Sequence, residues 1–340
     1  MQYSSEIQTY TIITITFPGQ HKQQLSLGLI IGGQLFESDG GKQVPGPETA
    51  TVAVFGGDCT VADLPHPRRN HVSLVTPGKN PRVLVCGGTA PDLYNPLRLL
   101  DSCLSYNLSD RQWIHHSTTL EPYAWAAGVS LSGGSNPGSY IFKRSGGEFL
   151  PQDSSVWQKG PEFPGGYTTA RPCVVATTHT TLLIFGVHGV FEYNAELEVW
   201  DNWKTSLLMG GRFGHACHLQ GRKVVVAGGS SSRSAGITTE LLDLDSREMR
   251  RAGDLTSDNY GSGMFQMGIP NREILIVFGG SNNSLLEQWD PEVETWTPSP
   301  AIMARKYLFS ATTVDASLVC KPGNEDILKR QAQFQPISFR

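Results

Sequence analysis

The segment Val224-Val225-Val226-Ala227-Gly228-Gly229 is a short apolar run that ends in two glycines, and runs of this kind recur along the chain. The other copies are Leu29 to Gly33, Val83 to Gly88 and Ile276 to Gly280, with weaker copies at Tyr140 to Phe142 and Leu182 to Gly186. Their mean spacing is about 49 residues, a period typical of repeated supersecondary units. The chain is therefore predicted to hold six such units.

A second marker keeps the same period. Bulky residues recur at Trp113, Trp157, Trp203, Met249 and Trp296, separated by 44, 46, 46 and 47 residues. Their fixed place suits a large side chain that packs between neighbouring units. We expect these tryptophans in the core.

Each unit divides into four β-rich pieces with turn residues between them, and helical periodicity is absent. Four antiparallel strands cannot bury both faces alone, so neighbouring units must stack around an axis. The sequence thus predicts an all-β fold, a six-bladed β-propeller over residues 29–319. We expect the C-terminal strand to pair with the N-terminal blade and complete it. Residues 1–28, which could add one strand, and the polar tail 320–340 lie outside this propeller.

An apolar run with two glycines, then a Tyr- or Asp-containing run and a Trp, is similar to the kelch motif, and the resemblance covers roughly residues 29–319. Within that family the chain resembles the invertebrate extracellular-type kelch proteins, in Cys59-Thr60-Val61-Ala62-Asp63-Leu64-Pro65, Cys86-Gly87-Gly88 and Ser102-Cys103-Leu104 with Trp113 after them. Blade three departs from the pattern because it lacks the glycine pair, and blade five has Met249 in place of Trp.

A third marker is partial. Arg68 and Arg212 each precede a histidine by three residues, whereas Arg171 and Arg305 fall near the same phase without one. Blades three and six are expected to carry an aromatic there instead, such as Tyr123 or Tyr260. A repeated arginine is more often a structural group that satisfies carbonyls near the axis than a ligand contact. We favour that structural role for Arg68 and Arg212 and leave both roles open for the others.

One face of the predicted propeller can be assigned, because the segment entering strand one and the loop joining strands two and three must lie together in a meander. Its long loops, of which Gly33 to Ala50 is one, are rich in Gly, Ser and Pro, as recognition loops on a rigid scaffold often are. Kelch propellers commonly bind protein ligands there, and Arg and aromatic residues are enriched in binding hot spots. The resemblance implies these candidate contacts: Arg98, Tyr123, Trp125, Arg171, Arg212, Arg233, Tyr260 and Arg305.

The amino-acid composition limits the classes of partner that we expect the protein to bind. With 27 Lys and Arg against 31 Asp and Glu, the chain has a net charge of about −4 and no electrostatic footprint for nucleic acid. No apolar run approaches the roughly 18 residues of a membrane-spanning helix. We therefore expect a protein ligand, with a glycan as the second class, and neither nucleic acid nor a membrane span.

Catalytic motifs are absent: the sequence has no nucleophile elbow, zinc-protease helix, phosphate loop or dinucleotide fingerprint. His115 and His116 are adjacent on a predicted strand, so they should point to opposite faces and cannot readily share a metal. A copper enzyme resembling galactose oxidase would need two His and two Tyr near His188, and no spacing assembles them. We expect no enzyme, cofactor or metal, with a copper-dependent or carbohydrate-active propeller as the minority alternative.

The six cysteines include no Cys-x-x-Cys pair. Cys86 ends a predicted second strand and Cys103 lies in the third strand of the same blade, so an antiparallel register could join them. A disulfide and two free thiols both remain open. Cys173 and Cys217 are interpreted as small buried hydrophobes. The pairing of Cys59 and Cys320 is left open.

The cellular compartment and the type of function are also predicted from sequence motifs and from the family resemblance. Asn107 and Asn282 begin glycosylation sequons, while the N-terminal segment lacks the basic and apolar parts of a signal peptide. The family resemblance slightly favours an extracellular location over the cytoplasm. The leading hypothesis is a non-enzymatic binding module. The first alternative is an intracellular kelch adaptor for a ubiquitin ligase or a cytoskeletal partner.

Overall fold

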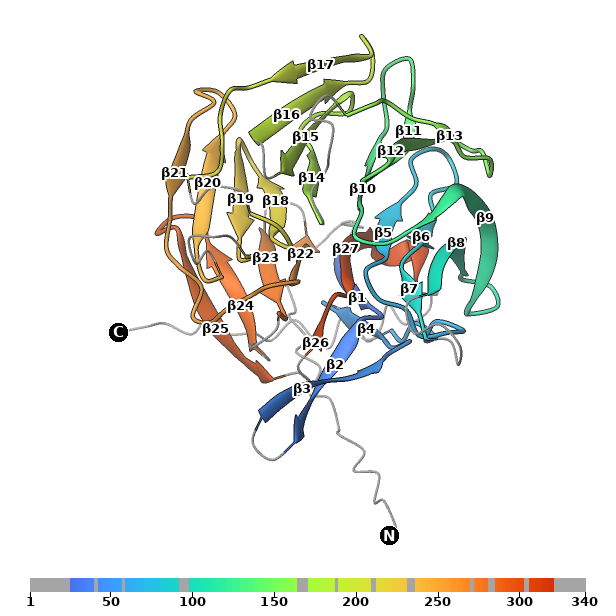
Figure 1. Ribbon diagram of the computed structural model, residues 1–340, viewed down its shortest axis with the longest axis horizontal. Coiled ribbons are helices and arrows are strands. Elements are labelled where there is room, and N and C mark those ends of the chain that lie inside the picture. Colours follow the sequence, from blue (N-terminus) through green and yellow to red (C-terminus); the bar gives the residue numbers. More distant parts are fainter. Residues whose placement is uncertain are drawn as a thin grey trace.

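The computed structural model describes residues 25–39, 42–56, 59–91, 98–163, 171–186, 189–208, 212–230, 236–269, 272–280, 285–302 and 306–320. These residues form β-strands and one short 3-10 helix, η1 (Ala316–Leu318). Within the described ranges, no helix could cross a membrane. The predicted all-β class is confirmed, and the antiparallel sheets lie around a common centre in an arrangement consistent with a β-propeller (Figure 1).

Three sheets have four strands, each joined to the next along the chain. The first contains β10 (Ala127–Leu131), β11 (Gly138–Lys143), β12 (Gly146–Pro151) and β13 (Gln158–Lys159). The second contains β14 (Cys173–Ala176), β15 (Thr181–Gly186), β16 (Gly189–Asn194) and β17 (Val199–Asn202). The third contains β18 (Ala216–Gln220), β19 (Lys223–Ala227), β20 (Thr239–Asp243) and β21 (Met249–Arg251).

The other sheets are less regular. One contains β5 (Val72–Val75), β6 (Val83–Cys86), β7 (Thr89–Ala90), β8 (Arg98–Asn107) and β9 (Gln112–Tyr123). The largest joins β22 (Gly263–Ile269), β23 (Arg272–Phe278), β24 (Leu285–Asp290) and β25 (Thr295–Ile302) to β1 (Ser26–Ile31), β4 (Val52–Phe55) and β27 (Ser310–Asp315). A small sheet contains β2 (Gln34–Asp39), β3 (Lys42–Glu48) and β26 (Lys306–Tyr307).

The innermost strands contact one another in series around the centre. Strand β5 contacts β10, β10 contacts β14, β14 contacts β18, β18 contacts β22, β22 contacts β27, and β27 contacts β5 again. The C-terminal strand also pairs with the first one, because β27 runs antiparallel to β1 from Ser26–Asp315 to Ile31–Ser310. The order of inner strands therefore returns to its start.

The segment between Gly33 and Ala50, which the sequence predicts to be a loop, contains two strands. Strands β2 and β3 form a hairpin that pairs from Gln34–Glu48 to Asp39–Lys42, with an irregularity after Gln34. It extends away from the other sheets (Figure 1). Because three of the seven residues of β3 are Pro or Gly, its sequence carries a stronger turn signal than strand signal.

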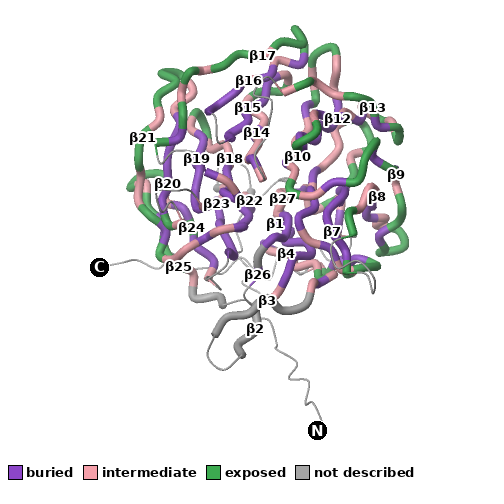
Figure 2. The backbone as a smooth tube through the Cα atoms, viewed as in Figure 1, coloured by how far each residue is buried: buried purple, intermediate pink, exposed green. Residues whose placement is uncertain are grey.

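The core lies between the sheets, where buried strands face one another, while the outer turns are exposed (Figure 2). The prediction that the repeated Trp residues are core is confirmed for Trp113, Trp157 and Trp296, which are 3–7% exposed. Trp203 is only half-buried. The indole N–H of Trp157 donates to Ser117 Oγ (3.0 Å) and that of Trp296 to Thr239 Oγ1 (2.8 Å), in each case a residue of the preceding sheet. The indoles therefore bond and pack across sheet boundaries.

Candidate functional site

Six residues form a closed ring of backbone hydrogen bonds, which we call the axial ring. Each lies two positions before the start of an inner strand. Its members are Asn70 (donating to Leu308 O, 2.7 Å), Trp125 (to Asn70 O, 3.1 Å), Arg171 (to Trp125 O, 3.0 Å), Gly214 (to Arg171 O, 3.2 Å), Gly261 (to Gly214 O, 2.9 Å) and Leu308 (to Gly261 O, 3.1 Å). Every residue in this ring donates once and accepts once.

All six members adopt the left-handed backbone conformation, with φ between 55° and 73°. Glycine adopts this conformation freely, but a residue with a side chain pays roughly 1–3 kcal/mol for it. Four of the six have side chains: Asn70, Trp125, Arg171 and Leu308. Such conformations persist only where the surrounding structure enforces them, and the closed ring provides that constraint.

The residue two positions before a ring member is buried at five of the six places, and the sixth, residue 169 before Arg171, lies outside the described residues. The five buried residues are Arg68, Tyr123, Arg212, Asn259 and Lys306, each no more than 5% exposed. The predicted phase of the arginine marker is therefore wrong in part. Arg171 is itself a ring member, Lys306 fills the buried position before β27, and Asn259 rather than Tyr260 fills it before β22. The placement of Tyr123 agrees with the prediction.

The paired glycines lie beside the segments that lead into the axial ring. Gly87 and Gly88 both have positive φ, 65° and 91°. The first donates its N–H to Ser102 O (3.1 Å), and the second to Tyr123 O (2.7 Å), at the end of β9 and two residues before the ring member Trp125. The pattern repeats at Gly228 and Gly229. A β-carbon on Gly88 would lie 2.5 Å from Arg69 O, so the repeat requires glycine there.

The buried arginines bind carbonyl groups, as their structural interpretation predicts. Arg68 donates to Gly87 O (3.1 Å) and Ser102 O (3.2 Å), and burial lowers the pKa of its guanidinium to about 10. Arg212 is fully buried and donates to Thr238 O (3.1 Å) and to Glu240. Because Arg212 and Tyr123 are enclosed, neither offers a surface to a partner, which removes them from the candidate contacts.

Sequence reasoning missed three buried glutamates, Glu148, Glu240 and Glu287, which are at most 2% exposed. Each accepts the backbone N–H of the segment that enters its sheet: Leu120 (3.1 Å), Leu208 (2.6 Å) and Thr256 (2.9 Å), respectively. A lone Glu in a strand ordinarily suggests a solvent-facing position. The available signal was the shared Glu-x-x-Asp spacing at Glu240 and Glu287, with Asp243 and Asp290.

The remaining candidate contacts differ in exposure. Trp125 is 50% exposed although its backbone belongs to the axial ring. Arg98 is exposed at the start of β8, beside Leu99, which is 48% exposed. Arg171 and Tyr260 are half-buried. Arg233 and Arg305 lie outside the described residues.

The predicted meeting of two loop types on one face is confirmed at Arg69 and Thr89. Their backbones exchange hydrogen bonds of 3.0 and 2.8 Å, which joins the entry to β5 to the loop after β6. The guanidinium of Arg69 also pairs with Glu48 Oε1 (2.8 Å) and donates to Gln34. Arg69 therefore fastens the base of the β2–β3 hairpin beside the axial ring.

The histidines that the structure describes do not come together at one site. His71 and His215 are buried, and burial lowers the pKa of His215 to about 3 and that of His71 well below its usual value, so both are neutral. His115 and His116 lie on β9 and bond hydroxyls of their own strand. Within the described ranges, no three His, Cys, Asp or Glu residues are placed to hold a metal ion. His188 lies outside those ranges.

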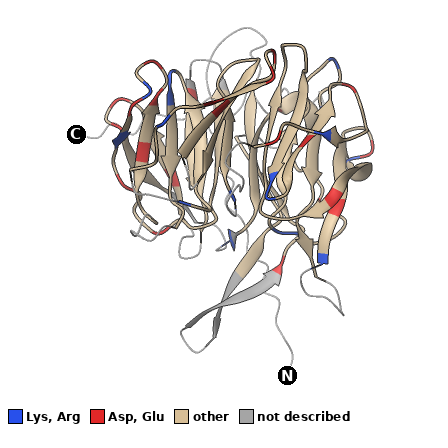
Figure 3. Cartoon of the chain, turned by 45° about the horizontal axis from the view of Figure 1, so that its top comes forward, with Lys and Arg blue, Asp and Glu red and all other residues tan. Residues whose placement is uncertain are grey.

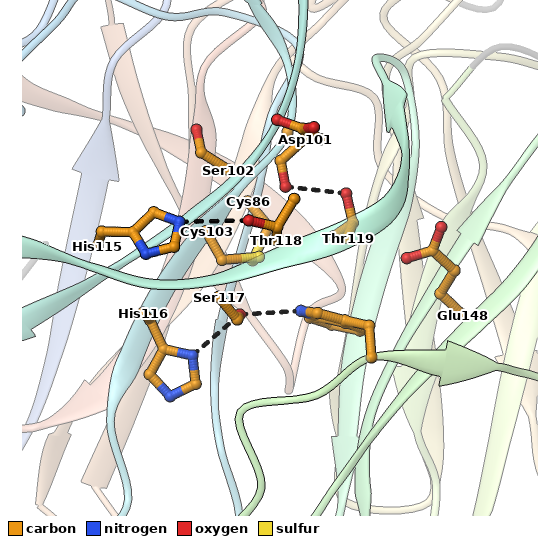
Figure 4. Close-up of a disulfide and its surroundings, with 12 residues drawn as sticks. Cys86, Asp101, Ser102, Cys103, His115, His116, Ser117, Thr118, Thr119 and Glu148 are labelled. Carbon is orange, nitrogen blue, oxygen red and sulfur yellow. Dashed lines mark hydrogen bonds between the residues drawn. A yellow bond between two sulfur atoms is a disulfide. The ribbon is translucent and has the colours of Figure 1, made fainter.

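All six cysteines are paired. Cys86 and Cys103 form a disulfide, which is one of the two alternatives that the sequence leaves open. The two are register partners in neighbouring strands (Figure 4). The interpretation of Cys173 and Cys217 as small buried hydrophobes is incomplete, because the two form a disulfide that joins β14 to β18 in adjacent sheets. Cys59 and Cys320 are bonded across 261 positions of sequence.

Asn107 shapes the turn between β8 and β9. Its Oδ1 accepts the Ser109 N–H (3.0 Å), and its Nδ2 donates to Asp110 (2.7 Å). Three residues at the equivalent turns accept backbone N–H groups in the same way: Asn194, Asp243 and Asp290. The turn alone therefore accounts for an Asn or Asp at this position. Asn282, the other sequon residue, lies outside the described residues.

Charged residues of both signs are scattered over the sheets and turns rather than gathered in one patch (Figure 3). No family model matches the chain, and no curated protein matches it either. The geometry of the axial ring and its surroundings is thus the basis for assigning a function.

Proposed function

We propose that the chain is a six-bladed kelch-type β-propeller that binds a protein ligand at the face carrying the axial ring. The inner strands that contact in sequence from β5 to β27, and the six-membered ring, support six blades. The pairing of β27 with β1 supports closure by the C-terminal strand. The glycine pairs, whose second N–H bonds to the residue two positions before the next ring member, support a kelch-type repeat.

The observation that carries the binding proposal is Trp125. Its indole is half exposed while its backbone is fixed in the ring at φ 60°. An exposed tryptophan on a rigid backbone provides a large contact area at little conformational cost, and tryptophan is the residue type most enriched in hot spots. Leu99 adds a second exposed apolar side chain in the neighbouring sheet that contains β5.

The three disulfides support an extracellular location over the intracellular adaptor alternative, because cytosolic reductants keep most thiols reduced. The partner search therefore begins with secreted and cell-surface proteins.

The test compares the wild-type protein with Trp125→Gly, because glycine keeps the left-handed backbone while removing the indole. Val293→Ala is the control: Val293 is 65% exposed in the β24–β25 turn, at the opposite end of the strands. Proteins retained from an extracellular protein mixture are quantified by mass spectrometry, and the Kd of each is then measured with purified partner.

Trp125→Gly should weaken a direct partner by about 30-fold or more, as loss of a hot-spot residue does, while Val293→Ala leaves its Kd unchanged. A partner that binds Trp125→Gly normally and is lost with Val293→Ala would place binding on the other face and refute the proposal.

A further inference from the structure

A polar cleft lies between two adjacent sheets, at the end of the strands opposite the axial ring. Its cavity volume is about 240 Å³. One wall is the β5–β6 turn from Thr76 to Arg82, and the other is the segment that follows β12, from Pro151 to Ser155. His116 of β9 and Ser139 of β11 also line it.

The two walls touch at Gly78. This glycine has φ 112°, and a β-carbon there would lie 2.8 Å from Asp153 Oδ1 and 2.9 Å from Gln152 Cγ. The close approach fixes the position of the β5–β6 turn against the neighbouring sheet. The cleft is therefore built by contacts between sheets and does not depend on a single loop.

Arg82 brings a positive charge to the cleft. It stands one residue before β6, and Arg222 stands in the same place before β19. Arg222 pairs with Asp245. Over the described part of the chain, no carboxylate pairs with the Arg82 guanidinium. The bonds of Arg82 are made by its backbone, which donates its N–H to Thr76 Oγ1 (2.9 Å) and accepts the Thr76 N–H at its carbonyl oxygen (2.9 Å). The charge of Arg82 is thus available to a ligand.

His116 adds a second donor on the same cleft. Its Nδ1 lies 3.0 Å from Ser117 Oγ (Figure 4). Ser117 Oγ also accepts the indole N–H of Trp157 (3.0 Å). Since the indole can only donate, the hydroxyl proton is free for Nδ1. We assign the neutral imidazole proton to Nε2. Burial and then the charge of Arg82 lower the pKa of His116, consistent with two donors near each other.

The remaining lining groups are suited to hydroxyls. Asp153 offers carboxylate oxygens, and Asn80 and Gln152 offer amide groups, with Gln152 Nε2 3.4 Å from Asp153 Oδ2. The cavity is smaller than the roughly 300–1,000 Å³ of sites for drug-sized ligands. We propose that this cleft binds one carboxylate-bearing sugar unit, with the carboxylate on Arg82 and His116 and the sugar hydroxyls on Asp153 and the amides. This site is separate from the protein-binding face proposed above.

Titration of the full chain with glucuronate tests the proposal, with methyl glucoside and sodium sulfate as separate probes. Binding is followed by NMR of labelled histidine side chains, with the His116 signal identified from His116→Gln. Glucuronate should shift that signal saturably and bind more tightly than either other probe. Arg82→Gln should weaken glucuronate by about 10- to 100-fold, the loss of a charge-assisted hydrogen bond, while the matched Arg222→Gln leaves it unchanged.

With the wild-type protein, three results would overturn the proposal: no saturable shift with glucuronate, equal binding of methyl glucoside, or equal binding of sulfate. The last would identify a simple anion site. Equal glucuronate affinity in Arg82→Gln would also overturn it. Because the cleft and Trp125 lie at opposite ends of the strands, none of these results depends on the protein-binding proposal.

Discussion

Arg212 and Glu240 form an ion pair in which both side chains are completely buried. The second oxygen of Glu240 accepts the Leu208 N–H, so one carboxylate connects the guanidinium to the segment that enters the sheet. Two charges without water are tolerated only while both are present and hydrogen-bonded. Removing one member of this pair should therefore destabilise the fold.

Glu240→Gln should lower the free energy of unfolding by about 3–5 kcal/mol, because it leaves the Arg212 charge buried without a counter-charge. Urea unfolding measures the change. Glu196→Gln, at an exposed turn position, is the control and should shift it by less than about 0.5 kcal/mol. The apolar pair Arg212→Met with Glu240→Leu should recover most of the loss; a double variant as unstable as the single one would contradict this account.

Gly229→Ala should destabilise the protein more than Gly221→Ala. Both glycines have positive φ, 83° and 59°, but a β-carbon on Gly229 meets the His215 backbone N at 2.8 Å, whereas Gly221 has open space around it. We expect roughly 1 kcal/mol for Gly221→Ala and at least about 2 kcal/mol more for Gly229→Ala, from thermal or urea unfolding. Equal losses would show that φ alone selects these glycines.

Stability should rise in mildly alkaline solution because of Lys306. Burial lowers the pKa of its ammonium from 10.5 to about 8, and its Nζ donates to Thr51 Oγ1 (2.7 Å). The unfolded chain therefore binds this proton more tightly, and the free energy of unfolding should increase by roughly 2 kcal/mol from pH 8 to pH 10. Lys306→Met should remove that increase. A variant with the wild-type pH slope would assign the effect to other groups.

Removing the bond between Cys173 and Cys217, as the double alanine variant, should lower the free energy of unfolding by about 2–4 kcal/mol. This disulfide links inner strands of adjacent sheets, so its loss should also speed hydrogen exchange along β14 and β18. Cys86 and Cys103 provide the comparison, because their bond lies within one sheet and its removal should affect exchange there only. Unchanged exchange at β14 and β18 would show that packing alone holds the two sheets together.

The repeat could be predicted from sequence where one residue type has one role. At Gly88, for example, the backbone has a positive φ and there is no space for a β-carbon. Glycine is the residue that meets both conditions. The tryptophans were predictable for a similar reason. The buried position before each ring member was not, since Arg68, Tyr123, Asn259 and Lys306 can all fill it.

Features that depend on contacts between sheets were beyond the sequence pattern. Cys173 and Cys217 are partners because β14 touches β18, a neighbour relation that no local motif records. The axial ring could not be predicted from the sequence, because its members share a backbone conformation rather than a type of side chain. Trp125 was singled out as an aromatic contact, but its place in the ring required the structure.

The bond between Cys59 and Cys320 bears on how the chain is made. At roughly 5–20 residues per second, a ribosome needs about 13–50 s to produce the 261 positions between them. Cys86 and Cys103 emerge much sooner, and Cys173 and Cys217 also precede Cys320. Throughout that interval, the Cys59 thiol is exposed to earlier, wrong partners. Rapid local closure of the other two bonds would leave Cys59 and Cys320 as the last pair, so oxidative maturation would finish with the joining of the two ends of the fold.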